Sequence, residues 1–200
     1  MQKTYLCIDL KSFYASVECV ELGLDPFEVN LVVADPTRGG GAITLAATPA
    51  IKKLGVSSRG RIFEIDPKIE YMITPPRMHL YMEYSCKVYK VFLEFIAKED
   101  IHVYSIDESF LDVTSYLKLY QVSAKNLAKK ILDRTYEKTG LTATVGIGTN
   151  LYLAKIAMDI SAKHNADRMA YLNEDLYRQT LWHLSLIHIS EPTRRTPISY

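Results

Sequence analysis

The sequence has few cysteines, and they are not arranged to hold a fold together. There are three in 200 residues, Cys7, Cys19 and Cys86, and no two of them form a CxxC pair. A small, odd and widely spaced set of cysteines is typical neither of a disulfide framework nor of a structural zinc site. The absence of both predicts a reduced, cytoplasmic protein.

Long apolar runs are also missing. The N-terminal stretch MQKTYLCIDLKSF is interrupted by Asp9 before it reaches the length of a signal-peptide core. No segment approaches the roughly 20 apolar residues that are needed to span a bilayer. We therefore expect neither a secretion signal nor a membrane partner.

The sequence has no excess of one charge. Its 24 Lys and Arg residues are balanced by 23 Asp and Glu residues, which gives a formal net charge of +1. Such a balance predicts no strong overall field toward nucleic acid or a membrane surface. Hydrophobic residues make up 48% of the chain and charged residues 24%, which is typical of a globular protein of one domain or two small ones.

Complete phosphate-binding motifs do not occur. There is no GxxxxGK[ST] sequence, and GIGTNL (146–151) lacks the last glycine of GxGxxG. The histidines show no metal-ligand spacing. These absences argue against a P-loop enzyme, a kinase and a dinucleotide-binding protein.

The end of the chain is set apart from the rest. The stretch LSLIHISEPTRRTPISY (184–200) resembles the translated read-through of a sequencing adapter, and we expect it to be non-native. The alternative is a natural tail rich in Pro and Thr. Without its two arginines and one glutamate, the totals of 24 and 23 become 22 basic and 22 acidic residues, so residues 1–183 are formally neutral.

Hydrophobic periodicity predicts strands and helices in alternation. Good N-cap residues, Ser12, Thr48 and Asn150, precede three of the helices, and Gly140 follows another. This order predicts an α/β or α+β fold with helices packed on a sheet. The predicted strands are 4–9, 30–35, 42–47, a hairpin over 101–114, and 141–148; the predicted helices are 12–22, 48–55, 77–99, 123–140, 150–163 and a region from 170 onward.

Acidic residues interrupt two of the apolar strands. Asp107 and Glu108 lie in the middle of VYSIDESFLDV (103–113), and Asp9 ends the first strand. If the two strands are neighbours, three carboxylates converge and repel one another. Two Mg²⁺ ions would relieve that repulsion and could clamp a phosphoryl transfer. The alternative is a solvated hairpin that carries ordinary surface charges.

Three segments resemble the signature motifs of Y-family translesion DNA polymerases. They are IDLKSFYASVE (8–18), YSIDESFLDVT (104–114) and TVGIGTNLYLAKIAMDISAK (144–163), and they occur in the order and at the intervals of that family. The first segment, extended through NLVVADPTR, is most similar to the UmuC-like branch of Gram-positive bacteria. The resemblance runs from about Thr4 to His183.

The resemblance implies a polymerase palm with a ferredoxin-like sheet and a small inserted fingers domain. Residues 1–11 and 78–169 match the palm, residues 12–77 the fingers, and residues 170–183 the start of a thumb. The family continues into a full thumb and a little finger that grips DNA. We therefore expect this chain by itself to bind DNA weakly.

The resemblance also implies a metal site. Asp9, Asp107 and Glu108 match the family's metal-binding carboxylates, and the backbone carbonyl of Leu10 matches a further metal contact. Two Mg²⁺ ions are the implied cofactors. Glu18 matches its motif without an implied chemical role.

A nucleotide site is implied beside the metals. Tyr14 matches the aromatic steric gate that rejects a ribose 2′-OH. The backbone around Ser12, Phe13 and Tyr14, together with Lys52 and Lys163, matches the groups that hold the triphosphate. Two departures, Pro49 where many relatives carry a tyrosine and the HN that follows Lys163, put other contacts of the fingers in doubt.

The activity that follows from the resemblance is nucleotidyl transfer from a dNTP to a primer 3′-OH, with low fidelity, past damaged template bases. The implied partners are primer–template DNA, dNTP and a sliding clamp. Two alternatives stay open from the residues alone. One is a nucleotidyl cyclase with a palm-like sheet, and the other is a catalytically silent fragment that only binds a partner.

Overall fold

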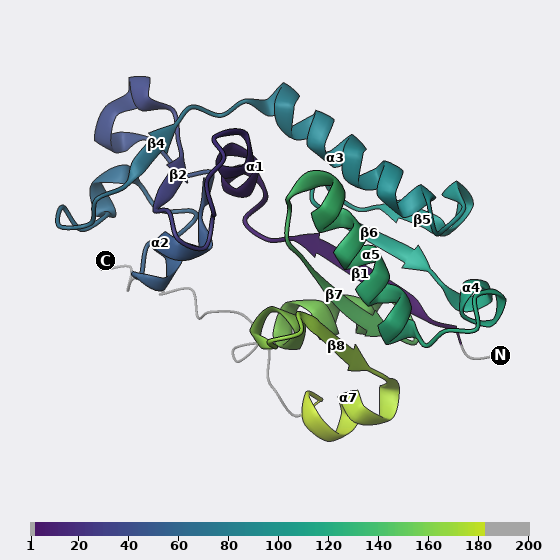
Figure 1. Ribbon diagram of the computed structural model, residues 1–200. Helices are drawn as coiled ribbons and strands as arrows, with labels where there is room; N and C mark the ends of the chain where they lie inside the picture. The colour runs from purple at the N-terminus through teal and green to yellow at the C-terminus, as the bar shows by residue number, and fades with distance from the viewer. Residues whose placement is uncertain (1–2, 183–200) are drawn as a thin grey trace, which may run out of the picture.

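A five-stranded sheet forms from the apolar runs, with the strand order β5-β6-β1-β7-β8. The computed structural model describes residues 3–182 (Figure 1), so the expected adapter-like tail lies outside the described residues. β1 is antiparallel to both β6 and β7, and β7 is parallel to β8. The strands are β1 (Tyr5–Leu10), β5 (Ile101–Val103), β6 (Glu108–Asp112), β7 (Ala143–Gly148) and β8 (Met169–Leu172).

The first four of these strands in chain order, β1, β5, β6 and β7, have the ferredoxin-like arrangement that the sequence predicts. Helix α3 (Met78–Leu93) precedes the β5–β6 hairpin, and helix α5 (Ala124–Thr139) crosses from it to β7. The short helix α4 (Thr114–Leu119) lies between β6 and α5. The mixed α+β fold class is confirmed, with β8 added at the edge.

Alternation along β1 assigns its side chains to two faces of the sheet. Leu6, Ile8 and Leu10 pack with residues of α3 and α5 in a large hydrophobic cluster, which we call the main core. Cys7, on the other face, packs against the segment that follows β7. Asp9 lies on this second face because it is two residues beyond Cys7.

A second, smaller sheet has the order β3-β2-β4. Its hydrophobic cluster, the small core, contains Val32 and Ile51, while Leu31 and Val33 face the main core. Helix α1 (Phe13–Glu21) lies beside this sheet and leads out of β1 (Figure 1). The elements of this part are β2 (Leu31–Val33), η1 (Pro36–Gly41), β3 (Ala46–Ala47), α2 (Pro49–Lys53), η2 (Ile62–Glu64) and β4 (Met72–Thr74).

Some elements differ from their predicted extents. The predicted strand 42–47 shrinks to β3, because Ile43 and Thr44 bond to Arg61 and Gly60 instead of β2. The helix predicted over 77–99 ends at Leu93, where bonds of the i→i+3 type replace helical ones. The strand β4 is not predicted at all. A short η3 (Lys98–Asp100) follows α3.

The largest differences are at the C-terminal side. The region predicted as helical from 170 begins instead with β8, because β7 offers it an open edge for parallel pairing, and α7 (Glu174–Thr180) follows. The sheet therefore continues past residue 169, where the palm was expected to end. The helix after Asn150 is divided into α6 (Leu151–Ile156), a π turn η4 (Ala157–Ser161) and η5 (Ala162–His164).

Among residues 3–182, no helix combines the length and the apolar character that crossing a membrane requires.

Candidate active site

The strand pairing brings the three predicted acids to one end of the sheet. Asp9 lies directly opposite Glu108 in the β1–β6 register. The backbone N–H of Leu10 donates to the carbonyl of Asp107 at 2.9 Å. The acids that are about a hundred positions apart in the sequence are therefore neighbours.

Each carboxylate has its own hydrogen-bonding partner. The Lys163 Nζ lies 3.0 Å from Asp9 Oδ2, and the Lys155 Nζ donates to both oxygens of Glu108 at 2.7 and 2.9 Å. Asp107 accepts a hydrogen bond from the Ser105 hydroxyl at 2.8 Å. Two lysines thus compensate two of the three charges, as partly buried carboxylates require.

Lys155 is a site residue that the sequence analysis missed. Its Nζ also lies 3.3 Å from Asp159 Oδ2, and Lys163 lies 2.8 Å from the other oxygen of the same carboxylate. The ladder Lys155–Asp159–Lys163 has i, i+4 spacing throughout. That spacing was visible in the sequence, but which residue the ladder faces was not.

The π turn η4 explains how both lysines face the sheet. At about 100° per residue, side chains eight positions apart in an α-helix differ by roughly 80° around the axis. A π turn takes up one extra residue, so Lys163 lies nearly in line with Lys155, at roughly 20°. The wide turn at Ala157–Ser161 therefore lets one helical segment reach both Glu108 and Asp9.

The three acids are not arranged as a complete metal-binding site among the described residues. Among the described residues, no group of three or more His, Cys, Asp and Glu side chains is placed so that it could hold a metal ion. The electrostatics nevertheless favour an added cation. Burial raises the pKa of Asp9 above its usual value, and the nearby charges of Asp107 and Glu108 raise it further against the opposing effect of Lys163.

The turn from β1 into α1 has an unusual backbone. Ser12 occupies the N-cap position with φ 51° and ψ 44°, which is left-handed and uncommon for a residue other than glycine. The predicted side-chain cap does not form. Instead, the Ser12 hydroxyl accepts a hydrogen bond from Lys52 Nζ at 2.9 Å. Strain of this kind is often found at functional sites.

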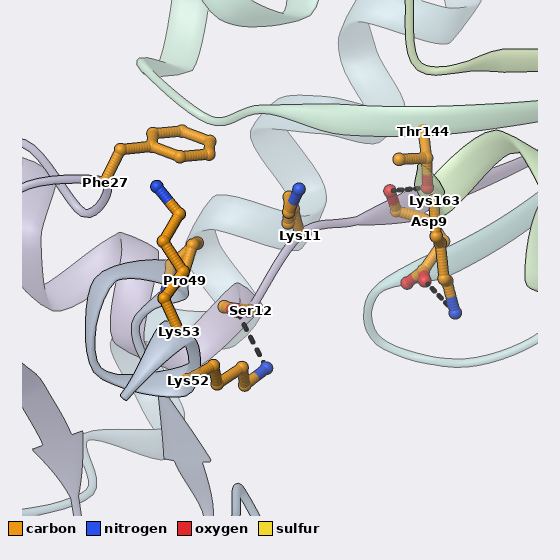
Figure 2. Close-up of a pocket in the computed structure, with 9 residues that line it drawn as sticks. All are labelled: Asp9, Lys11, Ser12, Phe27, Pro49, Lys52, Lys53, Thr144 and Lys163. Carbon is orange, nitrogen blue, oxygen red and sulfur yellow. Dashed lines mark hydrogen bonds and ion pairs between the residues drawn. The ribbon is translucent and has the colours of Figure 1, made fainter. Parts of the chain in front are cut away.

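A cavity of about 430 Å³ opens beside this turn (Figure 2). Lys11, Lys52, Lys53 and Lys163 line it, and Asp9 is the one acidic residue among its lining residues. Burial, followed by the positive charges of Arg168 and Lys53, lowers the pKa of Lys11. So many mutually repelling ammonium groups suit a ligand with several negative charges, such as a polyphosphate.

Lys11 and Lys53 are additions to the residues that the sequence analysis singled out. Each lies next to a residue that was named, Ser12 and Lys52 respectively, so the signal was local crowding of lysine. Only the structure shows that Lys11, which follows β1, and Lys53, at the end of α2, line the same cavity.

A second cavity, of about 320 Å³, adjoins the first and shares Asp9, Ser12 and Lys52 with it. The Tyr14 ring lines this cavity and stacks on the buried ring of Tyr81, with centroids 4.4 Å apart. Of the residues singled out from the sequence, the second cavity brings together Asp9, Leu10, Ser12, Phe13, Tyr14, Lys52 and Asp107. Lys163 lines only the first cavity, and Glu108 lines neither of them.

The chain matches one protein family and is similar to proteins of known sequence. Residues 8–159 match the model of the impB/mucB/samB family. The chain is 39% identical over 184 residues to the putative UV-damage repair protein UvrX of Bacillus subtilis, covering 90% of this chain and 42% of that protein. It is 36% identical over 187 residues to DNA polymerase IV 2 of the same organism, covering 92% of this chain and 44% of that protein.

The fold is also similar to solved structures. The insertion ternary complex of Dbh DNA polymerase matches with a TM-score of 0.76 at 26% identity, covering 92% of this chain and 53% of that one. The chain therefore spans about half the length of the relatives that it matches.

Proposed function

Because the chain belongs to the impB/mucB/samB family and has the fold of Y-family DNA polymerases, we propose that it supplies the catalytic half of a lesion-bypass DNA polymerase. The observation that carries the proposal is that Asp9 lines both the lysine-rich first cavity and the second cavity, with Asp107 beside it in the second cavity and Glu108 opposite it in the β1–β6 register. A nucleotidyl cyclase, which the residues alone left open, is not compatible with membership of this family.

The acids would hold two Mg²⁺ ions. Asp9, Asp107, Glu108 and the carbonyl of Leu10 are hard oxygen donors of the kind that Mg²⁺ prefers. The fit is supported by the raised pKa of Asp9, since burial and two neighbouring carboxylates disfavour its negative charge. When bound, two such ions would polarise the phosphoryl oxygens and clamp the attacking and leaving groups.

The triphosphate would occupy the lysine-lined cavity. Lys52 and Lys163 lie on either side of the turn at Ser12, and the first N–H groups of α1 point out of the helix start. Positive charge placed there stabilises the charge that develops on departing pyrophosphate. Pro49 lines the same cavity without a side-chain donor.

The sugar and base would lie in the second cavity. The Tyr14 ring faces it and would contact the deoxyribose as a steric gate against a 2′-OH. Phe13 is buried and packs at the edge of Tyr81, so its part in nucleotide binding is through its backbone.

The domain division expected from the family remains part of the proposal. Residues 1–11 and 78–169 would form the palm, 12–77 the fingers, and the segment from 170 onward would lead to the thumb. Because β8 belongs to the five-stranded sheet, the palm would extend to Leu172. Primer–template DNA is the proposed partner. Binding to a sliding clamp and a location in the cytoplasm remain predictions.

Template-directed incorporation tests this proposal. In a full-length protein, in which a thumb and a little finger follow these residues, we expect addition of the complementary dNTP onto a labelled primer, with a requirement for Mg²⁺. Asp107→Asn should lower that rate by about 100-fold or more, because one of the proposed carboxylate ligands of the Mg²⁺ ions is lost.

Asp112→Asn is the matched control. Asp112 lies at the other end of β6 and bonds to Thr114, so its loss should leave incorporation within about threefold. A rate that Asp107→Asn does not change would refute the assignment. Binding of Mg²⁺ and dNTP without any incorporation would identify the silent alternative.

A further inference from the structure

The Tyr14 ring has a firm support behind it. Its plane lies 16° from that of Tyr81, and the ring centroids are 4.4 Å apart. Tyr81 comes from the first turn of α3, is fully buried, and meets the ring of Phe13 nearly edge-on at 6.4 Å. Tyr14 therefore lines the second cavity and is stacked on a fully buried aromatic ring.

The Tyr81 ring is itself anchored at its far end. Its hydroxyl donates a hydrogen bond of 2.6 Å to Glu18 Oε1. Glu18 belongs to α1, and its carboxylate side chain is only 3% exposed. Burial and the bond to Glu18 raise the pKa of Tyr81, so the hydroxyl remains a donor at neutral pH.

Arg77 makes the buried charge of Glu18 tolerable. Its Nε donates to Glu18 Oε1 at 3.0 Å and its Nη2 to Oε2 at 2.6 Å, which is the two-pronged geometry of a strong arginine–carboxylate pair. A buried carboxylate without such a partner would be strongly destabilising. Arg77 immediately precedes α3, so the pair joins the start of α3 to the middle of α1 (Figure 1).

We propose that Glu18, Arg77 and Tyr81 are positioning residues that set how strictly the Tyr14 ring selects the sugar of a bound nucleotide. This inference rests on the proposed role of Tyr14 as the steric gate. A single ribose oxygen is rejected only if the ring that it meets cannot retreat by a fraction of an ångström. Rings locked by packing and by a second layer of hydrogen bonds meet that demand.

The same two helices contain an internal control. Tyr84 lies one turn after Tyr81, is also buried, and donates to Glu21 Oε1 at 2.7 Å. Its ring has no stacking contact with Tyr14 among the described residues. Removing the Tyr84 hydroxyl therefore disturbs the α1–α3 contact in a similar way without touching the support of Tyr14.

The test compares the affinities of ATP and dATP, each with Mg²⁺, for the wild-type protein and its variants. The measured quantity is the dissociation constant of ATP divided by that of dATP, which a working gate makes larger than one. Tyr14→Ala should bring this ratio close to one. Tyr81→Phe and Glu18→Gln should lower it by roughly two- to tenfold, the range for one lost hydrogen bond, through tighter binding of ATP. Tyr84→Phe should leave the ratio unchanged, since general destabilisation weakens both nucleotides alike.

A spectroscopic readout needs no nucleotide. With 3-fluorotyrosine at position 14, the ¹⁹F resonance should be single and sharp in the wild type and in Tyr84→Phe, and broadened or split in Tyr81→Phe. Tyr81→Phe keeps the Glu18–Arg77 pair, so it remains informative if Glu18→Gln fails to fold.

The outcomes separate the two proposals. If Tyr14→Ala lowers the ratio while Tyr81→Phe and Glu18→Gln do not, and the resonance stays sharp, the positioning role is overturned and the gate stands. If the protein binds neither nucleotide, or Tyr14→Ala leaves the ratio unchanged, the proposed nucleotide site fails and the positioning role falls with it.

Discussion

At the scale of single residues, the surroundings of Asp9 work against the stability of its ionised form in the fold. It is mostly buried, and Asp107 and Glu108 lie near it. Burial first, and these neighbours next, raise its pKa despite the ion pair with Lys163. The ionised form of Asp9 is therefore less favourable in the folded state than in the unfolded chain.

This environment predicts the sign of a pH effect. Because the pKa of Asp9 is raised in the folded state, its contribution to stability is lost as the pH rises from about 4 through the folded-state value. Asp9→Asn removes that penalty. Thermal unfolding without divalent cations should show the variant as more stable than the wild type at pH 7.5, with the difference closing toward pH 4.

Asp167→Asn gives the opposite control. The bond from Lys125, joined by the Met169 N–H, lowers the pKa of Asp167, so its replacement should be destabilising at pH 7.5 and neutral at low pH. Added Mg²⁺ should stabilise the wild type and not Asp9→Asn. A variant of Asp9 that is less stable than the wild type at pH 7.5 would contradict this account.

At the scale of elements, the close approach of α6 to β7 depends on two glycines. A Cβ atom at Gly146 would overlap the carbonyl oxygen of Ala154 and the N–H of Met158, and one at Gly148 would overlap the backbone of Ala154. These glycines let the lysine ladder of α6 and η4 lie close enough to the sheet to reach the acids.

Gly146→Ala should therefore be severely destabilising. Backbone atoms cannot yield as side chains do, so we expect the free energy of unfolding to fall by at least about 3 kcal/mol, the upper end for an overpacked core. Urea denaturation followed by circular dichroism would measure it.

Gly41→Ala is the matched control for this prediction. Nothing lies within 4 Å of a Cβ atom at Gly41, so the change should stay within about 0.5 kcal/mol. Equal effects of the two substitutions would show that strand–helix contact is not the reason for the glycine at 146.

At the scale of the whole molecule, the main core and the small core are distinct but joined. Leu31 and Val33 of β2 face the main core, and Val32 between them faces Ile51 in the small core. One strand of the proposed fingers thus packs on one face against the main core. The small core has far fewer buried side chains, so its part of the molecule should open first.

Ile51→Ala tests this difference. Deleting a fully buried isoleucine side chain costs about 2–5 kcal/mol. Hydrogen exchange measured by mass spectrometry should show faster exchange in β2, α2 and β4, with protection retained in β1, β6 and β7.

Ile131→Ala is the companion variant, since Ile131 is equally buried in α5 against the main core. It should speed exchange in the five-stranded sheet. If Ile51→Ala raises exchange uniformly along the chain, the two cores unfold as one unit.

Local physics determined much of this protein from the sequence alone. Apolar runs predicted β1, β6 and β7. Thr48 and Asn150 precede the first turn of their helices and Gly140 follows the last turn of α5, as predicted, because a cap acts within one turn. The resemblance of three motifs indicated the family, which the comparisons confirm. The roles of the individual site residues stay predictions.

Only the tertiary structure decided what lies beyond one turn of chain. β8 forms because β7 has a free edge, and β3 is short because its neighbours bond to the loop at Gly60. Lys155 faces Glu108 because two glycines of β7 let α6 approach the sheet, and the π turn that follows α6 brings Lys163 to Asp9. Tyr81 supports Tyr14 because α1 and α3 pack together around Glu18. Such contacts join residues far apart in the sequence, so no local pattern encodes them.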